Sequence, residues 1–194
     1  MENVEILKQL REVTGVSVTQ CQKALKEANN DFEKAKEILR KWGSSFADKK
    51  IERTTKQGII ESYIHSNKKL GVLLEIRCET DFVAKSDDFK NLAHELALHI
   101  AGMNPQYVKE DEIPAEIIEK EKQIYIEQMA NSEKPANIVG QIIEGKLSTF
   151  KKESCLLSQP FVKDSSKTVE QVIKEIIAKL GENIVVRRFI KYDI

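Results

Sequence analysis

Apolar side chains recur every three or four positions through residues 1–43, which predicts three short amphipathic helices. Ser17 with Gln20, and Asn30 with Glu33, have the spacing of capping boxes, in which side chains satisfy the free N–H groups of a helix start. Gly43 stands where a glycine in the left-handed conformation would end the third helix. The expected apolar positions are Val4, Leu7, Leu10, Val18, Cys21, Leu25, Ala28, Phe32, Ala35, Ile38 and Leu39.

The period of the pattern changes from 3.6 to 2 after a charged and polar stretch at residues 44–56, and a period of 2 is typical of strands. We expect one strand around residues 60–65 and a turn at residues 66–69. The inward face of the next strand would carry Leu70, Val72, Leu74, Ile76 and Cys78. Two strands joined by so short a turn are expected to pair as an antiparallel hairpin.

Helical periodicity returns after Ser86, which is a favourable N-cap because two aspartates follow it in the first turn. Pro114 and Pro135 stand where two further helices begin. Thr168 and Gln171 form a capping box in front of the last helical pattern.

Gly181 ends that pattern, and the apolar residues 184–190 that follow are typical of a central or covered strand. Strands and helices are segregated along the chain more than they alternate, so we predict an α+β fold. We expect a three-helix docking domain at residues 1–43, a linker at 44–56, and an α+β core at 57–194 in which helices cover a small antiparallel sheet.

Charge and hydropathy narrow the class of partner. Lys+Arg and Asp+Glu number 31 each, so the formal net charge is zero, whereas a protein that grips nucleic acid through phosphates is usually basic. No apolar run approaches the roughly 18–20 residues that cross a bilayer. The N-terminus is acidic and lacks the pattern of a signal peptide. We therefore expect a cytoplasmic protein that binds proteins or small molecules, with no membrane or direct nucleic-acid contact.

The residues that could carry chemistry are sparse. Cys21, Cys78 and Cys155 form no CxxC pair and have apolar neighbours, which favours buried thiols; a bond between two copies of one cysteine across a dimer axis stays open. The three histidines are too dispersed for a zinc site. The sequence also lacks a glycine-rich phosphate loop, a nucleophile elbow and an HExxH motif. We expect a binding protein with no metal or cofactor, and not an enzyme.

One connection, between the second strand and the helix after Ser86, places an aromatic residue beside a carboxylate. Such strand-to-helix connections often carry function. Two interpretations of Asp81 and Phe82 stay open. Asp81 is a local cap and Phe82 fills the core, or Phe82 is an exposed hot spot that acts as a wedge against a partner.

Several segments, spread from one end of the chain to the other, carry a further signal. They are Leu10-Arg11-Glu12 with Thr14-Gly15, residues 21–25, residues 78–85, His99-Ile100-Ala101 with Met103-Asn104-Pro105, Cys155-Leu156-Leu157 with residues 159–164, and Asn183 with Val186-Arg187-Arg188. In this combination and order they closely resemble the elongation factor Ts family, the nucleotide-exchange partner of the translational GTPase elongation factor Tu.

The resemblance implies a guanine-nucleotide exchange factor with an N-terminal domain like a ubiquitin-associated domain and an α+β core that binds the GTPase. In the family, one motif inserts near the nucleotide site and helps to dislodge Mg²⁺; the corresponding residues here are Thr80, Asp81, Phe82 and Val83. The residues that resemble the family's N-terminal contact with the GTPase are Leu10, Arg11, Thr14 and Gly15. The core is short for the family, and short members tend to dimerise, so we also expect a homodimer.

Two other functional classes stay open at this point. The chain could be an adaptor whose helical domain binds another protein while the core dimerises, or an accessory protein that binds RNA. Zero net charge and the lack of strands with interleaved aromatic and basic residues count against RNA. The rate of GDP release from elongation factor Tu separates all three classes.

Overall fold

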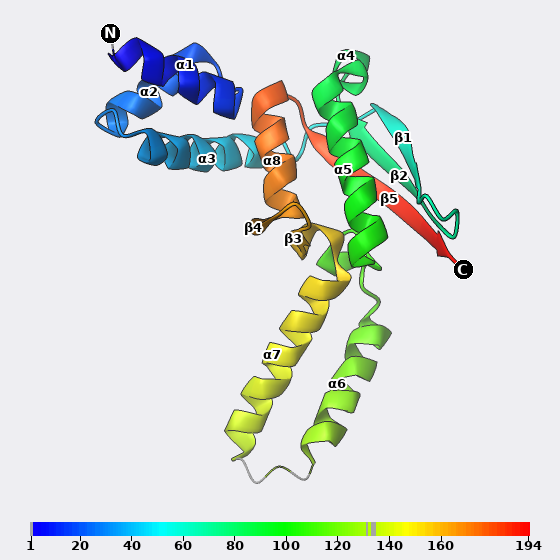
Figure 1. The fold of residues 1–194 in the computed structure, drawn as a ribbon. Coiled ribbons are helices and arrows are strands. Elements are labelled where there is room, and N and C mark those ends of the chain that lie inside the picture. The colour runs from blue at the N-terminus through cyan, green and yellow to red at the C-terminus, as the bar shows by residue number, and fades with distance from the viewer. Residues whose placement is uncertain (1, 131, 133–134) are drawn as a thin grey trace. The chain divides into compact units, whose positions relative to one another are not determined.

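The computed structural model describes residues 2–130, 132 and 135–194, and Figure 1 shows their arrangement. Its helices are α1 (Glu2–Thr14), α2 (Val18–Glu27), α3 (Phe32–Asp48), α4 (Asp81–Lys85), α5 (Asp87–Met103), η1 (Glu110–Glu112), α6 (Ala115–Met129), α7 (Ala136–Ser154), η2 (Leu156–Ser158) and α8 (Val169–Leu180). Its strands are β1 (Gln57–Ile64), β2 (Leu70–Cys78), β3 (Pro160–Phe161), β4 (Asp164–Thr168) and β5 (Ile184–Asp193). The mixture of helices with a small antiparallel sheet confirms the α+β prediction.

The chain forms two compact units. The first consists of Met1–Glu61, Glu75–Glu95 and Gln171–Arg187, and the second of Ser62–Leu74, Leu96–Glu170 and Arg188–Ile194. Both units are therefore built from segments that are distant in sequence. None of the helices in the described part of the chain is long and apolar enough to cross a membrane.

The three-stranded sheet has the order β1-β2-β5. The expected hairpin is present, and His65 donates its N–H to the Leu70 carbonyl across the turn at 2.9 Å. The expected inward face of β2 is also confirmed for Val72, Leu74, Ile76 and Cys78, which are buried, whereas Leu70 at the start of the strand is half-buried. A second sheet, β3 with β4, was not expected because the polar strand β4 has no apolar alternation.

Residues 184–190 were expected to form a central or covered strand; the strand is not central, and one of its faces is covered. β5 lies at an edge of the sheet, and β2 is the central strand. The apolar run in β5 is explained by its two faces: Ile184 and Val186 are buried, whereas Val185 is 37% exposed and Ile190 is 44% exposed. An apolar run does not by itself distinguish a strand with neighbours on both sides from one with a neighbour on one side.

The first three helices enclose the small core that their periodicity predicts. Its buried members are Leu10, Cys21, Ala24, Leu25, Ala28, Ala35 and Leu39. Ser17 caps α2 as expected, since its hydroxyl accepts the Gln20 N–H at 3.4 Å. Two predicted core positions were wrong: Val4 is 71% exposed and Val18 is 44% exposed.

Two predicted limits of α3 were also wrong. Asp31, and not Asn30, is the N-cap, because the Asp31 carboxylate accepts the Lys34 N–H at 3.0 Å while Asn30 adopts a left-handed φ of 63°. The helix also continues past Gly43 to Asp48. A Cβ at Gly43 would lie 3.1 Å from the Cβ of Ala178, so glycine at this position allows α3 to approach α8 closely.

The later helix limits agree with the sequence. Ser86 accepts the Phe89 N–H at the start of α5, and Pro114 and Pro135 are the N-caps of α6 and α7. Gly181, with a φ of 79°, follows the last residue of α8. α6 and α7 pack against each other as a helical pair (Figure 1).

His99 is a fully buried histidine in the second unit, and its hydrogen bonds favour the neutral ring. Its Nδ1 accepts the Val162 N–H at 3.2 Å, so its Nε2–H donates to the Gln159 side-chain oxygen at 2.8 Å. Gln159 in turn donates its amide to the Glu153 carbonyl. Burial lowers the pKa of His99 below its ordinary value, since the charged ring loses hydration.

This lowered pKa predicts a loss of stability in mild acid. The unfolded chain binds the proton of His99 from about pH 6.5 downward, whereas the folded chain resists it, so the free energy of unfolding should fall as the pH decreases below about 6.5. His99→Asn should be less stable at neutral pH and should lack this component of the pH dependence. Urea unfolding between pH 5 and 8 tests the difference, with His94→Asn, at an exposed histidine, as the control. Equal pH dependence in wild type and His99→Asn would contradict it.

Candidate partner-binding site

The strand-to-helix connection singled out in the sequence is a short helix, α4, and not a loop. Thr80 is its N-cap, with a hydroxyl that accepts the Val83 N–H at 3.4 Å. Asp81 instead accepts a hydrogen bond from the Lys85 ammonium at 2.7 Å. This bond holds the pKa of the Asp81 carboxyl below its usual range. The interpretation of Asp81 as the local cap was therefore wrong.

Phe82 projects from α4 into solvent, with 84% of its surface exposed. Ala84, on the same short helix, is buried, and Val83 is half-buried. α4 thus packs on the molecule through its smaller residues. The interpretation of Phe82 as part of the core was wrong, and its ring is accessible to a partner.

Hydrogen bonds from the turn between α8 and β5, residues Gly181–Asn183, hold the start of α4 in place. The two carboxylate oxygens of Glu182 accept the Thr80 N–H at 2.9 Å and the Thr80 hydroxyl at 2.7 Å. In the opposite direction, the Asn183 N–H donates to the Glu79 carboxylate at 2.7 Å. The end of β2 and the α8–β5 turn are therefore joined by reciprocal charge-assisted bonds, which are stronger than neutral ones.

Asn183 extends these contacts to the chain that follows α3. Its buried side-chain amide donates to the carbonyls of Ile51 and Arg53, at 3.1 and 2.9 Å. Lys50, which is also buried, donates to the Gly181 carbonyl. Residues 50–53, within the segment expected to be a linker, are thus bonded to the α8–β5 turn.

The N-terminal candidate residues divide into buried and accessible ones. Leu10 is fully buried in the three-helix core, and Arg11 is exposed. Thr14 donates its hydroxyl to the Leu10 carbonyl at 2.6 Å, and Gly15 ends the turn with a φ of 66°. A Cβ on Gly15 would lie 2.8 Å from the side chain of Lys179, near the end of α8.

The same lysine connects this turn to the start of α5. The Lys179 ammonium lies 2.5 Å from the Asp88 carboxylate, two residues after the Ser86 that ends α4. The first unit therefore places Gly15 beside Lys179, near the end of α8, and joins Thr80 to Glu182, two residues beyond the end of that helix. Sequence reasoning missed Lys179 and Glu182, since neither lies in a recognisable motif.

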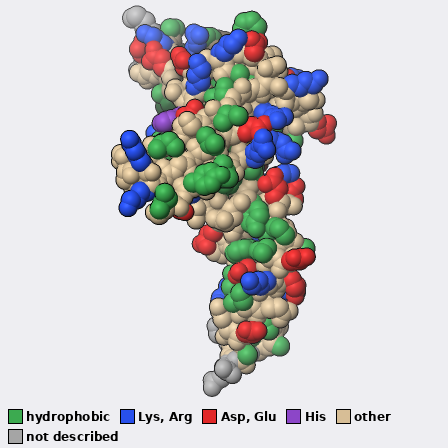
Figure 2. Space-filling view, turned by 90° about the vertical axis from the view of Figure 1, so that its right-hand side faces the viewer, with side chains coloured by type: hydrophobic (Ala, Val, Ile, Leu, Met, Phe, Trp, Pro, Cys, Tyr) green, Lys and Arg blue, Asp and Glu red, His purple; other side chains and the backbone are tan. Residues whose placement is uncertain are grey.

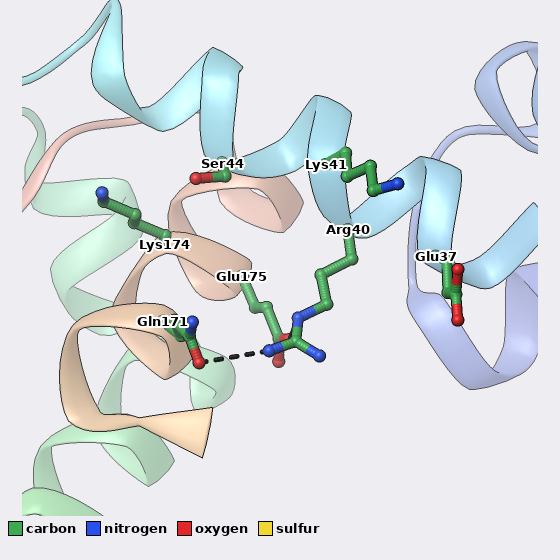
Figure 3. Close-up of a pocket in the computed structure, with 7 residues that line it drawn as sticks. All are labelled: Glu37, Arg40, Lys41, Ser44, Gln171, Lys174 and Glu175. Carbon is green, nitrogen blue, oxygen red and sulfur yellow. Dashed lines mark hydrogen bonds and ion pairs between the residues drawn. The ribbon is translucent and has the colours of Figure 1, made fainter. Parts of the chain in front are cut away.

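A surface groove of about 300 Å³ lies between α3 and the part of α8 from Gln171 onward, and charged and polar side chains line it (Figure 3). Arg40 extends across it to the Gln171 side-chain oxygen at 3.1 Å and lies 3.9 Å from the Glu175 carboxylate. Lys174 pairs with Asp48 at 2.9 Å. These contacts fix α3 against α8.

The cysteines and the possible metal-binding side chains are where a reactive thiol or a metal site would be found. All three cysteines are buried and free, as expected. Burial, with smaller contributions from nearby carboxylates, raises the pKa of the Cys78 and Cys155 thiols to about 11, so both are protonated at neutral pH. No cluster of three or more metal-binding side chains occurs in the part of the chain that the structure describes.

Comparison with known proteins accounts for nearly the whole chain. The sequence profile of the family described as Elongation factor TS matches residues 4–176. An elongation factor Ts from Coprothermobacter proteolyticus is 54% identical over 192 residues, which cover 99% of this chain and 98% of the relative. The chain belongs to the elongation factor Ts family.

Two further relatives show how evenly the family similarity extends. Elongation factor Ts from Thermosipho melanesiensis is 52% identical over 194 residues, covering 100% of this chain and 99% of the relative. That from Thermotoga maritima is 53% identical over 192 residues, covering 99% and 96%. Membership of the elongation factor Ts family gives the chain a role in translation elongation.

Proposed function

We propose that this chain is a guanine-nucleotide exchange factor that binds the GDP-bound form of elongation factor Tu, promotes GDP release, and so allows GTP to bind. The observation that carries the proposal is Phe82, a large aromatic side chain that is 84% exposed at the tip of a helix fixed by hydrogen bonds. An aromatic ring held in a fixed position on the surface offers a partner a large apolar area to bury, as the central aromatic residues of protein interfaces do.

The proposed mechanism is a competition between the exchange factor and the nucleotide. If Phe82 and its neighbours enter the GTPase near the Mg²⁺ and phosphate site, they disturb the ion that neutralises the phosphate charge, and GDP binds less tightly. Such coupling is reciprocal, so GDP must weaken the binding of this chain by the same factor. The chain itself changes no covalent bond in this scheme and is not an enzyme in its own right.

We assign different parts in this scheme to the candidate residues. Phe82 is the wedge, Thr80 fixes the start of α4, and Asp81 and Val83 complete the surface around Phe82. In the N-terminal segment, Arg11 is the accessible contact. Leu10, Thr14 and Gly15 fix its backbone and neighbouring turn, because Leu10 is buried and Thr14 bonds to its carbonyl.

The three-helix segment at residues 1–43 is, in this proposal, a docking domain like a ubiquitin-associated domain, followed by residues 44–56 and the GTPase-binding core at 57–194. It gives the GTPase a second contact away from Phe82. Because translation elongation takes place in the cytoplasm, we propose that the chain acts there, and that it needs no cofactor.

Stopped-flow release of fluorescent GDP from elongation factor Tu tests the proposal. We expect release to accelerate in proportion to the concentration of this chain until it saturates, and we expect a higher Mg²⁺ concentration to reduce the acceleration. The spontaneous release rate of elongation factor Tu alone is the control. An adaptor would leave the rate unchanged, and an RNA-binding protein would instead show RNA affinity that falls with salt.

We also propose that the chain forms a homodimer through the open face of the β1–β2 hairpin. On this face Ile64 is 64% exposed and Leu73 is 46% exposed. Figure 2, which views the side of the molecule on which β1 and β2 lie, shows hydrophobic side chains at the surface there. A two-fold axis would bring the same face of two copies together.

Sedimentation equilibrium at micromolar concentration tests this arrangement. We expect twice the mass of one chain for the wild type and the mass of one chain for Leu73→Glu, because the two-fold axis would bring like charges together. Val4→Glu, at an exposed apolar residue of α1, should remain dimeric. A wild-type mass of one chain at every concentration would contradict the dimer.

A further inference from the structure

We propose that Glu182 is the positioning residue for the exchange activity: its carboxylate fixes the N-terminal turn of α4 and thereby sets the direction in which Phe82 projects. This inference rests on the proposed function and names a residue outside the motifs singled out in the sequence. Glu182 itself lies behind the exposed aromatic and acts through Thr80.

The need for such a residue follows from the length of α4. The helix has five residues, whereas an isolated helix of fewer than about 12 residues is unstable in water. Its own capping bond, from the Val83 N–H to the Thr80 hydroxyl, is long at 3.4 Å. The direction of Phe82 is therefore set by contacts from outside the helix.

Glu182 supplies two of these contacts at the residue where α4 begins. Its oxygens accept both donors of Thr80, the N–H at 2.9 Å and the hydroxyl at 2.7 Å. Because the hydroxyl proton points to Glu182, the oxygen lone pairs of Thr80 remain directed at the Val83 N–H. One carboxylate thus fixes the backbone and the rotamer of the capping residue together.

The backbone on either side of Glu182 is itself fixed by hydrogen bonds of the residues directly before and after it. Gly181, with its left-handed φ, accepts a bond from Lys50, and Asn183 bonds to Glu79, Ile51 and Arg53. Below Thr80, the Cys78 thiol donates to the Thr80 carbonyl at 3.1 Å. Glu182 therefore connects a rigid turn to a short helix that cannot hold its own direction.

Exchange kinetics with Glu182→Ala, measured in the wild-type and Phe82→Ala backgrounds, test the inference. In the wild-type background GDP release should slow by about 2- to 30-fold, the range for a residue that acts through another. In the Phe82→Ala background the same substitution should slow it no further. Glu182→Gln, which keeps the size and one acceptor oxygen, should give an intermediate rate. Glu175→Ala, at a half-buried glutamate of α8 that pairs with Arg40, is the matched control and should exchange normally.

Amide hydrogen exchange by NMR on the chain alone gives a readout that does not depend on elongation factor Tu. The Val83 and Ala84 amides, which bond to the Thr80 hydroxyl and carbonyl, should exchange faster in Glu182→Ala, while amides of the α1–α3 core remain protected. Protection of Val83 and Ala84 equal to wild type would overturn the inference. So would an unchanged GDP release rate, or equal slowing in both Phe82 backgrounds. If the wild-type chain fails to accelerate release at all, the proposed function fails, and the amide data still report whether Glu182 holds α4.

Discussion

Replacing Phe82 with alanine is expected to slow GDP release from elongation factor Tu by at least about tenfold, which corresponds to about 1.4 kcal/mol. The free energy of unfolding should stay within about 0.5 kcal/mol of wild type, because the ring is 84% exposed and its removal leaves no cavity. Stopped-flow release at saturating concentrations of the variant, together with urea unfolding of the same preparation, measures both quantities.

Tyr192→Ala is the matched control for this prediction. It also removes an aromatic ring from the surface, at a residue that is 65% exposed near the end of β5, and it should exchange GDP at the wild-type rate. If Phe82→Ala unfolds at lower urea but exchanges normally per folded molecule, Phe82 supports the fold and the wedge is wrong.

Replacing Phe89 with alanine should have the opposite pair of effects. Phe89 is fully buried in the first turn of α5, so the same chemical change leaves a cavity and should lower the free energy of unfolding by about 3–5 kcal/mol. Exchange activity per folded molecule should stay near that of wild type. Urea unfolding gives the stability, and exchange at a temperature where the variant is still folded gives the activity.

Each phenylalanine variant is therefore a control for the other. The two residues stand seven positions apart on either side of Ser86, and the same substitution is expected to act differently because Phe82 is exposed and Phe89 is buried. A loss of less than about 1 kcal/mol in Phe89→Ala would mean that the site collapses around the alanine. Strongly reduced exchange in a fully folded Phe89→Ala would show that the wedge includes more of α5 than Phe82 and its neighbours.

Much of the local structure followed from the sequence, because it depends on residues close together in the chain. Ser17 caps α2 through Gln20, three residues away, and Ser86 caps α5 through Phe89 in the same manner. The alternation in β2 correctly identified its buried face, since period-2 hydrophobicity requires only one covered side. The residues of the candidate site were also found from the sequence, through their resemblance to the elongation factor Ts family.

The errors occurred where a distant segment decides the outcome. Gly43 has the local signature of a helix end, yet α3 continues to Asp48, and the glycine instead leaves room for Ala178, far along the chain, to approach. Residues 184–190 have the apolar run of a central or covered strand, and in the structure β5 has a neighbour on only one side and one covered face. In both cases the local pattern fits two structures, and long-range packing selects one of them.

The exposure of Phe82 could be decided only by the tertiary structure. The sequence places an aromatic residue beside an acid after a strand, and that pattern fits a ring in the core as well as a ring in solvent. The choice depends on Thr80, which caps α4, and on Glu182, which accepts both of its donors from 102 residues away in the chain. The sequence alone determined which residues form the candidate site. Their direction was decided by hydrogen bonds across the fold, because a five-residue helix has too few internal bonds to hold its own direction.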